Sequence, residues 1–97
     1  MPTFVTLMNW TDQGIQTFKD SPDRAEAARA AWQPLGITLK DIYWTIGPYD
    51  LVCIVEAPDP ESLTAALLML GSQGNLRSTT MRGFSADEMR AVVAKAG

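Results

Sequence analysis

The sequence predicts an α+β sandwich in which four strands and two main helices follow the order β-α-β-β-α-β, with a further helix at the C-terminus. Two observations support this fold class, and a third gives the number of domains. A hairpin with the turn Gly47-Pro48-Tyr49-Asp50 lies between two apolar, β-branched segments. The pairs Ser21-Pro22 and Asp59-Pro60 each join a helix-capping residue to a proline suited to a first helical turn. A length of 97 residues predicts one domain, residues 1–97.

The first half of the chain is predicted to form a strand, a helix and a second strand. Residues 3–10 carry apolar side chains on both alternating sides, which is typical of a strand covered on both faces. Thr11-Asp12 can cap a short helical turn that extends to Phe18. A helix over about residues 22–33 follows, ended by Pro34 and Gly36, and residues 37–46 form the second strand.

The second half repeats this pattern with a helix between two strands. Residues 51–57 are apolar on both faces, as expected of a central strand. Asp59-Pro60 opens a helix whose apolar stripe lies on one side. A loop over residues 71–75 leads to a fourth strand, residues 76–84. Ser85 and Glu88 have the spacing of a capping box, and the last helix carries Met89, Val92 and Val93.

This order of elements predicts the ferredoxin-like fold, in which two right-handed crossovers place both main helices on one face of the sheet. The other face then lacks a cover, although the first strand is apolar on both sides: Phe4, Met8 and Trp10 on one, Val5 and Leu7 on the other. We therefore expect a second subunit to pack sheet to sheet, giving a homodimer or a higher homo-oligomer through the open sheet face.

Composition and charge argue against several classes of function. A net charge of -3 and scattered lysines and arginines argue against nucleic acid as a partner. The chain has no histidine, which removes imidazole bases and the commonest transition-metal ligand; no metal site and no cofactor are predicted. The single cysteine, Cys53, is expected to be a buried small hydrophobe. Without an apolar run of membrane-spanning length or a leader pattern, we expect a cytoplasmic protein without membrane contact.

The central segment, residues 43–52, resembles the signature of the GYD-domain family, named for a Gly-Tyr-Asp motif. Here Pro48 stands between Gly47 and Tyr49-Asp50, which is a departure at the name-giving site. Other similar segments are Thr6-Leu7, residues 10–14, residues 21–25, residues 56–59 and residues 71–77. The resemblance covers nearly the whole chain. It implies a small bacterial protein with a ferredoxin-like fold and a dimeric α/β-barrel type of assembly, and it implies no established activity.

The hairpin contains the first candidate site residues. Asp50, beside Tyr49, could act as a general acid or base if it is buried. Alternatively, Asp50 accepts backbone N–H bonds within the turn, and Tyr49 buries its ring with its hydroxyl bonded, for example across a subunit contact. Glu56 lies farther along the third strand on a largely apolar face. It either pairs with Arg77 or Arg82 of a neighbouring strand or lines a pocket.

Two further groups of residues are candidates for ligand or interface contacts. An aromatic and thioether set on the first two strands is typical of a core or a subunit interface, and could also line a cleft for a planar apolar ligand. Its members are Phe4, Met8, Trp10, Tyr43 and Trp44. The loop after the second helix offers Ser72, Asn75 and Arg77 to a carboxylate or phosphate, or simply closes the helix with glycine.

Two classes of function remain open at this point. The first is a homo-oligomeric module that binds a small, partly apolar molecule or has a regulatory or structural role. The alternative is a cofactor-independent enzyme of the isomerase or oxygenase type, in which Asp50 or Glu56 is the acid or base because the chain has no histidine. The second class rests on an analogy of fold only.

Overall fold

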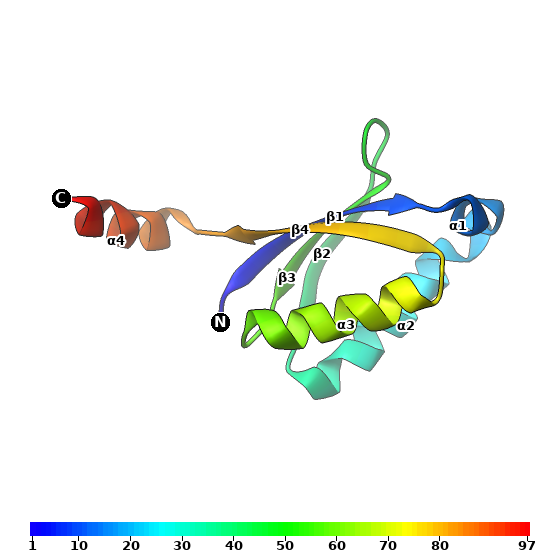
Figure 1. Cartoon of the computed structure of the whole chain (residues 1–97), viewed down its shortest axis with the longest axis horizontal. Helices are drawn as coiled ribbons and strands as arrows, with labels where there is room; N and C mark the ends of the chain where they lie inside the picture. Colours follow the sequence, from blue (N-terminus) through cyan, green and yellow to red (C-terminus); the bar gives the residue numbers. More distant parts are fainter.

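The computed structural model describes all 97 residues and contains one antiparallel sheet with the strand order β2-β3-β1-β4. Helices α2 and α3 lie together on one face of this sheet (Figure 1). The strands are β1 (Thr3–Trp10), β2 (Thr38–Trp44), β3 (Leu51–Glu56) and β4 (Leu76–Gly83). The predicted α+β, ferredoxin-like fold is therefore confirmed, with β1 and β3 as its central strands.

Three helices begin at the capping residues that the sequence predicts, Thr11, Asp59 and Ser85. The helices are α1 (Asp12–Gln16), α2 (Ser21–Trp32), α3 (Pro60–Ser72) and α4 (Ala86–Ala96), with 3₁₀ turns at Phe18–Asp20 and Gln33–Leu35. The predicted cap Ser21 was wrong, because Ser21 is already helical and the N-cap residue of α2 is Asp20, which makes no side-chain cap bond. The Asp59 carboxylate accepts the Ser62 N–H at 2.7 Å, so it satisfies one of the free N–H groups at the start of α3.

Two predicted boundaries were wrong, and the predicted end of the first long helix near Gln33 is confirmed with one addition, a 3₁₀ turn. The loop expected over residues 71–75 is shorter, because α3 continues through Ser72 and the chain reverses at Gly74, whose φ is 84°. Strand β2 stops at Trp44, and Ile46 is fully exposed. The region after Trp32 continues as a 3₁₀ turn that includes Pro34, and it ends at Gly36 with a φ of 76°.

The core lies between the sheet and the two helices. Alternate residues of β1 and β3 point into it, and α2 and α3 cover them. Its largest fully buried side chains include Met8, Ile37, Leu63 and Val55. Thr6 is also fully buried, and its hydroxyl shares a hydrogen bond of 3.2 Å with Thr80 on β4. Cys53 belongs to this core at 2% exposure, which confirms its prediction as a small buried hydrophobe.

The opposite face of the sheet carries the other alternate residues and is covered by no helix of this chain (Figure 1). Val5 is paired with Ile54, and Leu7 with Val52, so four aliphatic side chains lie at its centre. All four are only half-buried. The predicted apolar, uncovered sheet face is thus present in the fold, and we call these four residues the open-face patch.

Helix α4 projects beyond the end of β4, away from α2 and α3 (Figure 1). Its start is defined by a complete capping box: Glu88 N–H donates to Ser85 Oγ at 3.1 Å, and Ser85 N–H donates to Glu88 Oε1 at 2.9 Å. Arg82 also pairs with Glu88 at 3.2 Å. The side chains of Met89, Val92 and Val93 form an exposed apolar stripe along one side of this helix.

Acidification is expected to unwind α4 before the rest of the fold. The hydrogen bond from the Ser85 N–H is the main cause that holds the pKa of Glu88 below its ordinary value of 4.5, and the hydrogen bond from Arg82 is the second. Because the pKa is lower in the folded state, this contribution to stability is complete above pH 4.5 and is lost as the pH falls through the folded-state pKa. Cα chemical shifts of Ala91 and Ala94 should therefore move towards coil values below pH 4.5, while those of β1 stay unchanged. In Glu88→Gln this titration should disappear; if it persists, another group is responsible.

Candidate functional site

Two segments far apart in the sequence meet beside the C-terminal end of β1. The segment after β1 is joined to the turn before β4, because the Thr11 N–H donates to the Asn75 carbonyl at 3.1 Å. Gln13 Nε2 adds bonds of 3.0 Å to the Gln73 carbonyl and to Asn75 Oδ1. Both segments are among those that resemble the GYD-domain family, and the fold brings them into contact.

The central hairpin reaches the same end of the sheet. The Asp50 N–H donates to the Met8 carbonyl at 2.9 Å, and Asp50 Oδ2 accepts the Trp10 N–H at 2.9 Å. Asn9 Nδ2 donates to the Pro48 carbonyl at 2.8 Å. The expectation that Asp50 accepts N–H bonds within its own turn was wrong, since its carboxylate extends the hydrogen bonding of β1. The turn is closed by Thr45, whose N–H donates to the Asp50 carbonyl at 2.8 Å.

Gly14 allows α1 to approach the turn before β4. A Cβ atom at this position would lie 2.0 Å from the Asn75 carbonyl oxygen, far inside contact distance. The Thr11 hydroxyl accepts the Gly14 N–H at 3.0 Å and donates to the Gly74 carbonyl. A residue with any side chain at position 14 would therefore separate the two segments.

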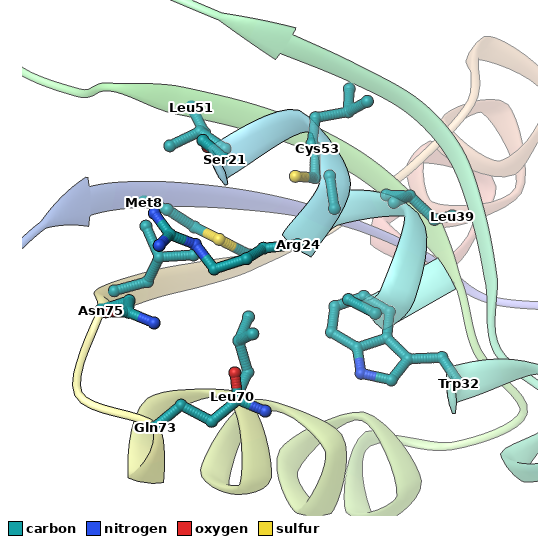
Figure 2. Close-up of a pocket in the computed structure, with 14 residues that line it drawn as sticks. Met8, Ser21, Arg24, Trp32, Leu39, Leu51, Cys53, Leu70, Gln73 and Asn75 are labelled. Atoms are coloured by element: carbon teal, nitrogen blue, oxygen red, sulfur yellow. The ribbon is translucent and has the colours of Figure 1, made fainter. Parts of the chain in front are cut away.

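A pocket lies between α2, α3 and the sheet, next to this meeting point (Figure 2). Its volume is about 30 Å³, and ten of its fourteen lining residues are hydrophobic. Arg24, Gln73 and Asn75 lie at one end, and Trp32 closes the other (Figure 2). Cys53 lies in its floor, where burial raises the pKa of the thiol to about 11. This sulfur is a neutral apolar surface at physiological pH, which argues against a nucleophile.

The predicted aromatic set is divided between the two faces of the sheet. Phe4 and Met8 are in the core, whereas Tyr43 lies on the open face with 61% of its surface exposed. Trp44 points to the helix side, and its Nε1–H donates to Ser21 Oγ at 2.9 Å beside the pocket. Trp10 packs against the core, and its buried Nε1–H has no hydrogen-bond partner. The five residues therefore do not form a single cleft.

Glu56 forms the expected ion pair, but with a different residue. Its Oε1 lies 2.9 Å from Lys40 Nζ on β2, and the bond and charge of Glu56 raise the pKa of Lys40. Arg77 and Arg82 are on β4, and β1 lies between β3 and β4. The prediction of Arg77 or Arg82 as its partner was therefore wrong.

Asp50 and Glu56 are too far apart to act together. They lie at opposite ends of β3, and at about 3.3 Å per residue this places them roughly 20 Å apart. Each carboxylate already has a partner within the chain, Trp10 N–H for Asp50 and Lys40 for Glu56. The structure thus offers no paired acid and base.

The three residues proposed around the glycine-rich loop diverge as well. Asn75 Oδ1 accepts from Gln13 and its side chain lines the pocket. Ser72 lies in α3 and donates to the Met69 carbonyl at 2.6 Å. Ser72 and Arg77 line a separate surface hollow of about 430 Å³ between α3 and β4. Ser72 and Arg77 therefore do not join Asn75 in one anion cradle.

Metal ligands and membrane-spanning helices were also sought in the structure. No group of three or more Cys, Asp or Glu side chains is close enough to hold a metal ion. None of the helices has the length and apolar character needed to cross a membrane.

The fold and its open sheet face define the class of protein: an α+β domain of the ferredoxin-like type. Two solved structures with low sequence identity share this fold. MtbAldR superposes with a TM-score of 0.69 at 15% identity, over 87% of this chain and 52% of MtbAldR, so the chain spans about half of that protein. FFRP-DM1 superposes with a TM-score of 0.61 at 21% identity, over 87% of this chain and 100% of FFRP-DM1.

The chain belongs to the GYD-domain family, because the GYD domain matches residues 4–93. A Thermus thermophilus relative, named glutamine synthetase and cystathionine beta-lyase binding protein, is 35% identical over 82 residues. That alignment covers 84% of this chain and 86% of the relative. The crystal structure of TTHA0845 from Thermus thermophilus is 27% identical and superposes with a TM-score of 0.54. It covers 89% of this chain and 96% of TTHA0845.

Sequence reasoning missed four residues of this region. Asn9 and Gln13 connect the signature segments, and Ser21 and Arg24 line the pocket. Three of them, Gln13, Ser21 and Arg24, lie within segments that resemble the family. That resemblance was the available signal, whereas no local pattern indicated that these segments meet.

Substituting Gly14 by alanine is expected to destabilise the fold by about 1–3 kcal/mol, because the new methyl group overlaps the Asn75 carbonyl. Gly71→Ala is the matched control: this glycine is helical, and a Cβ there meets nothing within 4 Å. That change should be neutral or stabilising by up to about 1 kcal/mol. Urea unfolding of both variants measures the difference. Equal stability of the two would contradict the close approach of α1 and the turn.

Proposed function

We propose that this protein is a homo-oligomeric binding module with a regulatory role, assembled through the open sheet face. The observation that carries the proposal is the open-face patch, four aliphatic side chains on the two central strands without a cover. Isolated apolar side chains on a surface are ordinary, but a contiguous patch on a sheet is typical of a contact between proteins.

A second copy of the chain is the occupant that fits this face best. The patch lies across the two central strands, and a two-fold axis through it would bring each patch against its equivalent. Tyr43 and Met81, both exposed on the flanking strands, would extend the apolar contact. The Lys40–Glu56 pair would lie at its polar rim. Two sheets packed in this way form a sandwich with about 10 Å between them.

Protein partners are the second part of the proposal. The Thermus relative is named for binding two enzymes, glutamine synthetase and cystathionine beta-lyase, and this chain shares 35% identity with it. The α4 helix supplies a suitable surface outside the sheet, since Met89, Val92 and Val93 form an exposed apolar stripe. An amphipathic helix of this kind binds by placing its apolar side in a groove of its partner.

The alternative of a cofactor-independent enzyme has less support. It requires Asp50 or Glu56 as an acid or base. Asp50 is hydrogen-bonded to the backbone of β1, and Glu56 is paired with Lys40. No observation favours this function over binding.

Sheet-to-sheet assembly predicts that Val52→Asp yields a folded monomer where the unmodified protein is a dimer or larger. A carboxylate forced into an apolar interface without a partner costs about 3 kcal/mol or more, which weakens association more than about 100-fold. Sedimentation equilibrium measures the change. Leu68→Asp is the control, because Leu68 is 69% exposed on α3, on the other side of the molecule. A monomeric unmodified protein, or a dimer that persists in Val52→Asp, would contradict the proposal.

Binding to protein partners predicts a measurable complex with purified glutamine synthetase or cystathionine beta-lyase from the same organism, in surface plasmon resonance. Val92→Asp should weaken this complex at least tenfold, because it places a charge in the apolar stripe of α4. Ala94→Asp introduces the same charge on the opposite side of α4 and should leave binding unchanged. Absence of binding to both enzymes, or equal effects of the two substitutions, would argue against this role.

A further inference from the structure

The pocket between α2, α3 and the sheet results from the small side chains of α2. Helix α2 buries only Ser21 at its start and Trp32 at its end. Ser21 is held by Trp44 at 2.9 Å, so both ends of α2 are fixed on the sheet side. Between these ends α2 presents small side chains, Ala25 and Ala28, toward the sheet and α3. Alanine methyl groups do not fill the distance set by the two ends, and a gap remains.

A groove between α2 and α3 lies next to this gap. The groove has a volume of about 210 Å³ and is lined by eight residues, six of them hydrophobic. It shares five residues with the pocket between the helices and the sheet: Arg24, Ala28, Trp32, Leu70 and Gln73. The two spaces therefore lie side by side along Ala28 and Leu70, and we refer to them together as the channel.

The polar end of the channel carries a positive charge that has no acidic partner. Arg24 takes part in none of the four ion pairs of the chain. Its guanidinium donates only to neutral oxygens, Thr17 Oγ1 at 2.7 Å and the Gly14 carbonyl at 3.4 Å. A guanidinium has five N–H donors, so several remain for another acceptor. Gln73 and Asn75 add amide groups at the same end (Figure 2).

We propose that this channel binds a short aliphatic carboxylate, with the carboxylate at Arg24 and the chain between Ala28 and Leu70. The half-buried arginine without an acidic partner selects an anion, in a protein whose net charge is -3. The groove, at about 210 Å³, is smaller than the roughly 300–1,000 Å³ of sites for drug-sized molecules, and so favours a short chain. Cys53 in the floor is a neutral thiol, and binding is therefore non-covalent.

The site lies on the helix side of the sheet, whereas the open-face patch lies on the other. The ligand proposal therefore rests on the general role of a binding module, but not on assembly through the sheet. In this proposal Arg24 binds the carboxylate of the ligand in addition to its hydrogen bond to Gly14 of α1. The ligand would connect α2, α3 and the turn before β4, and would reduce the relative motion of these segments.

The test uses hexanoate and its uncharged analogue hexanamide, titrated into the full chain with ¹H–¹⁵N spectra recorded at each step. Hexanoate should shift the resonances of Arg24, Ala28 and Leu70. Hexanamide should bind at least about tenfold more weakly, the effect of one charge-assisted hydrogen bond. In Arg24→Met the two compounds should bind equally. Shifts confined to the open sheet face or to Arg77, or equal affinities for the unmodified protein, would overturn the proposal.

Filling the channel provides a second, independent arm of the test. Ala28→Leu places a larger side chain in the channel and should reduce the affinity for hexanoate at least tenfold. Ala31→Leu, at the rim of the groove, is the substitute if Ala28→Leu does not fold by circular dichroism. Ala30→Leu on the exposed side of α2 is the matched control and should not change affinity. Unchanged affinity in the folded channel variant would overturn the site.

Sedimentation of the same samples separates this proposal from the assembly proposal. A dimer that does not bind hexanoate overturns the channel site and leaves the sheet-face assembly intact. A monomer that binds hexanoate overturns the assembly and leaves the channel site intact.

Discussion

The structure depends on the pairing of β1 with β3 and on the Asp50 carboxylate that extends it. Leu51 pairs with Met8, and Asp50 Oδ2 accepts the Trp10 N–H just beyond that point. This contact defines where β3 begins along β1. A shift by one residue would exchange Cys53 and Val55 of the core with the aliphatic residues of the open face. The register of these two strands therefore determines both the core and the surface available for assembly.

Local patterns predicted the elements well, because alternation and capping residues act over a few positions. The failures concern contacts between distant segments. Alternation places Lys40 on the opposite side from Leu39, but it cannot show that an irregularity between Leu39 and Asp41 shifts the register of β2 against β3. This irregularity lies where Lys40 reaches Glu56. In the same way, the hydrogen bonds that join Trp10, Thr11 and Gln13 to their partners span 40 or more positions and have no local signal.

The channel between α2 and α3 illustrates a different limit of sequence reasoning. The alanines of α2 are evident in the sequence, and small residues usually allow two elements to approach closely. Here the approach is set at the two ends of the helix, by Ser21 with Trp44 and by Trp32. The same residues that would favour tight packing therefore line an empty space. The distance between α2 and α3 decides whether these alanines pack tightly or line a space, and that distance is a property of the whole fold.

The projecting helix α4 has a consequence for strength of binding. A homodimer would display two copies of its apolar stripe at a fixed spacing, because each is joined to its sheet through Arg82 and the capping box. A partner with several identical subunits could engage both copies at once. The second contact would then form at a high effective concentration, and overall avidity could exceed the affinity of one helix by about 10²–10⁴. A short helix with a modest apolar stripe would suffice for stable attachment to an oligomeric partner and would bind a monomeric one only weakly.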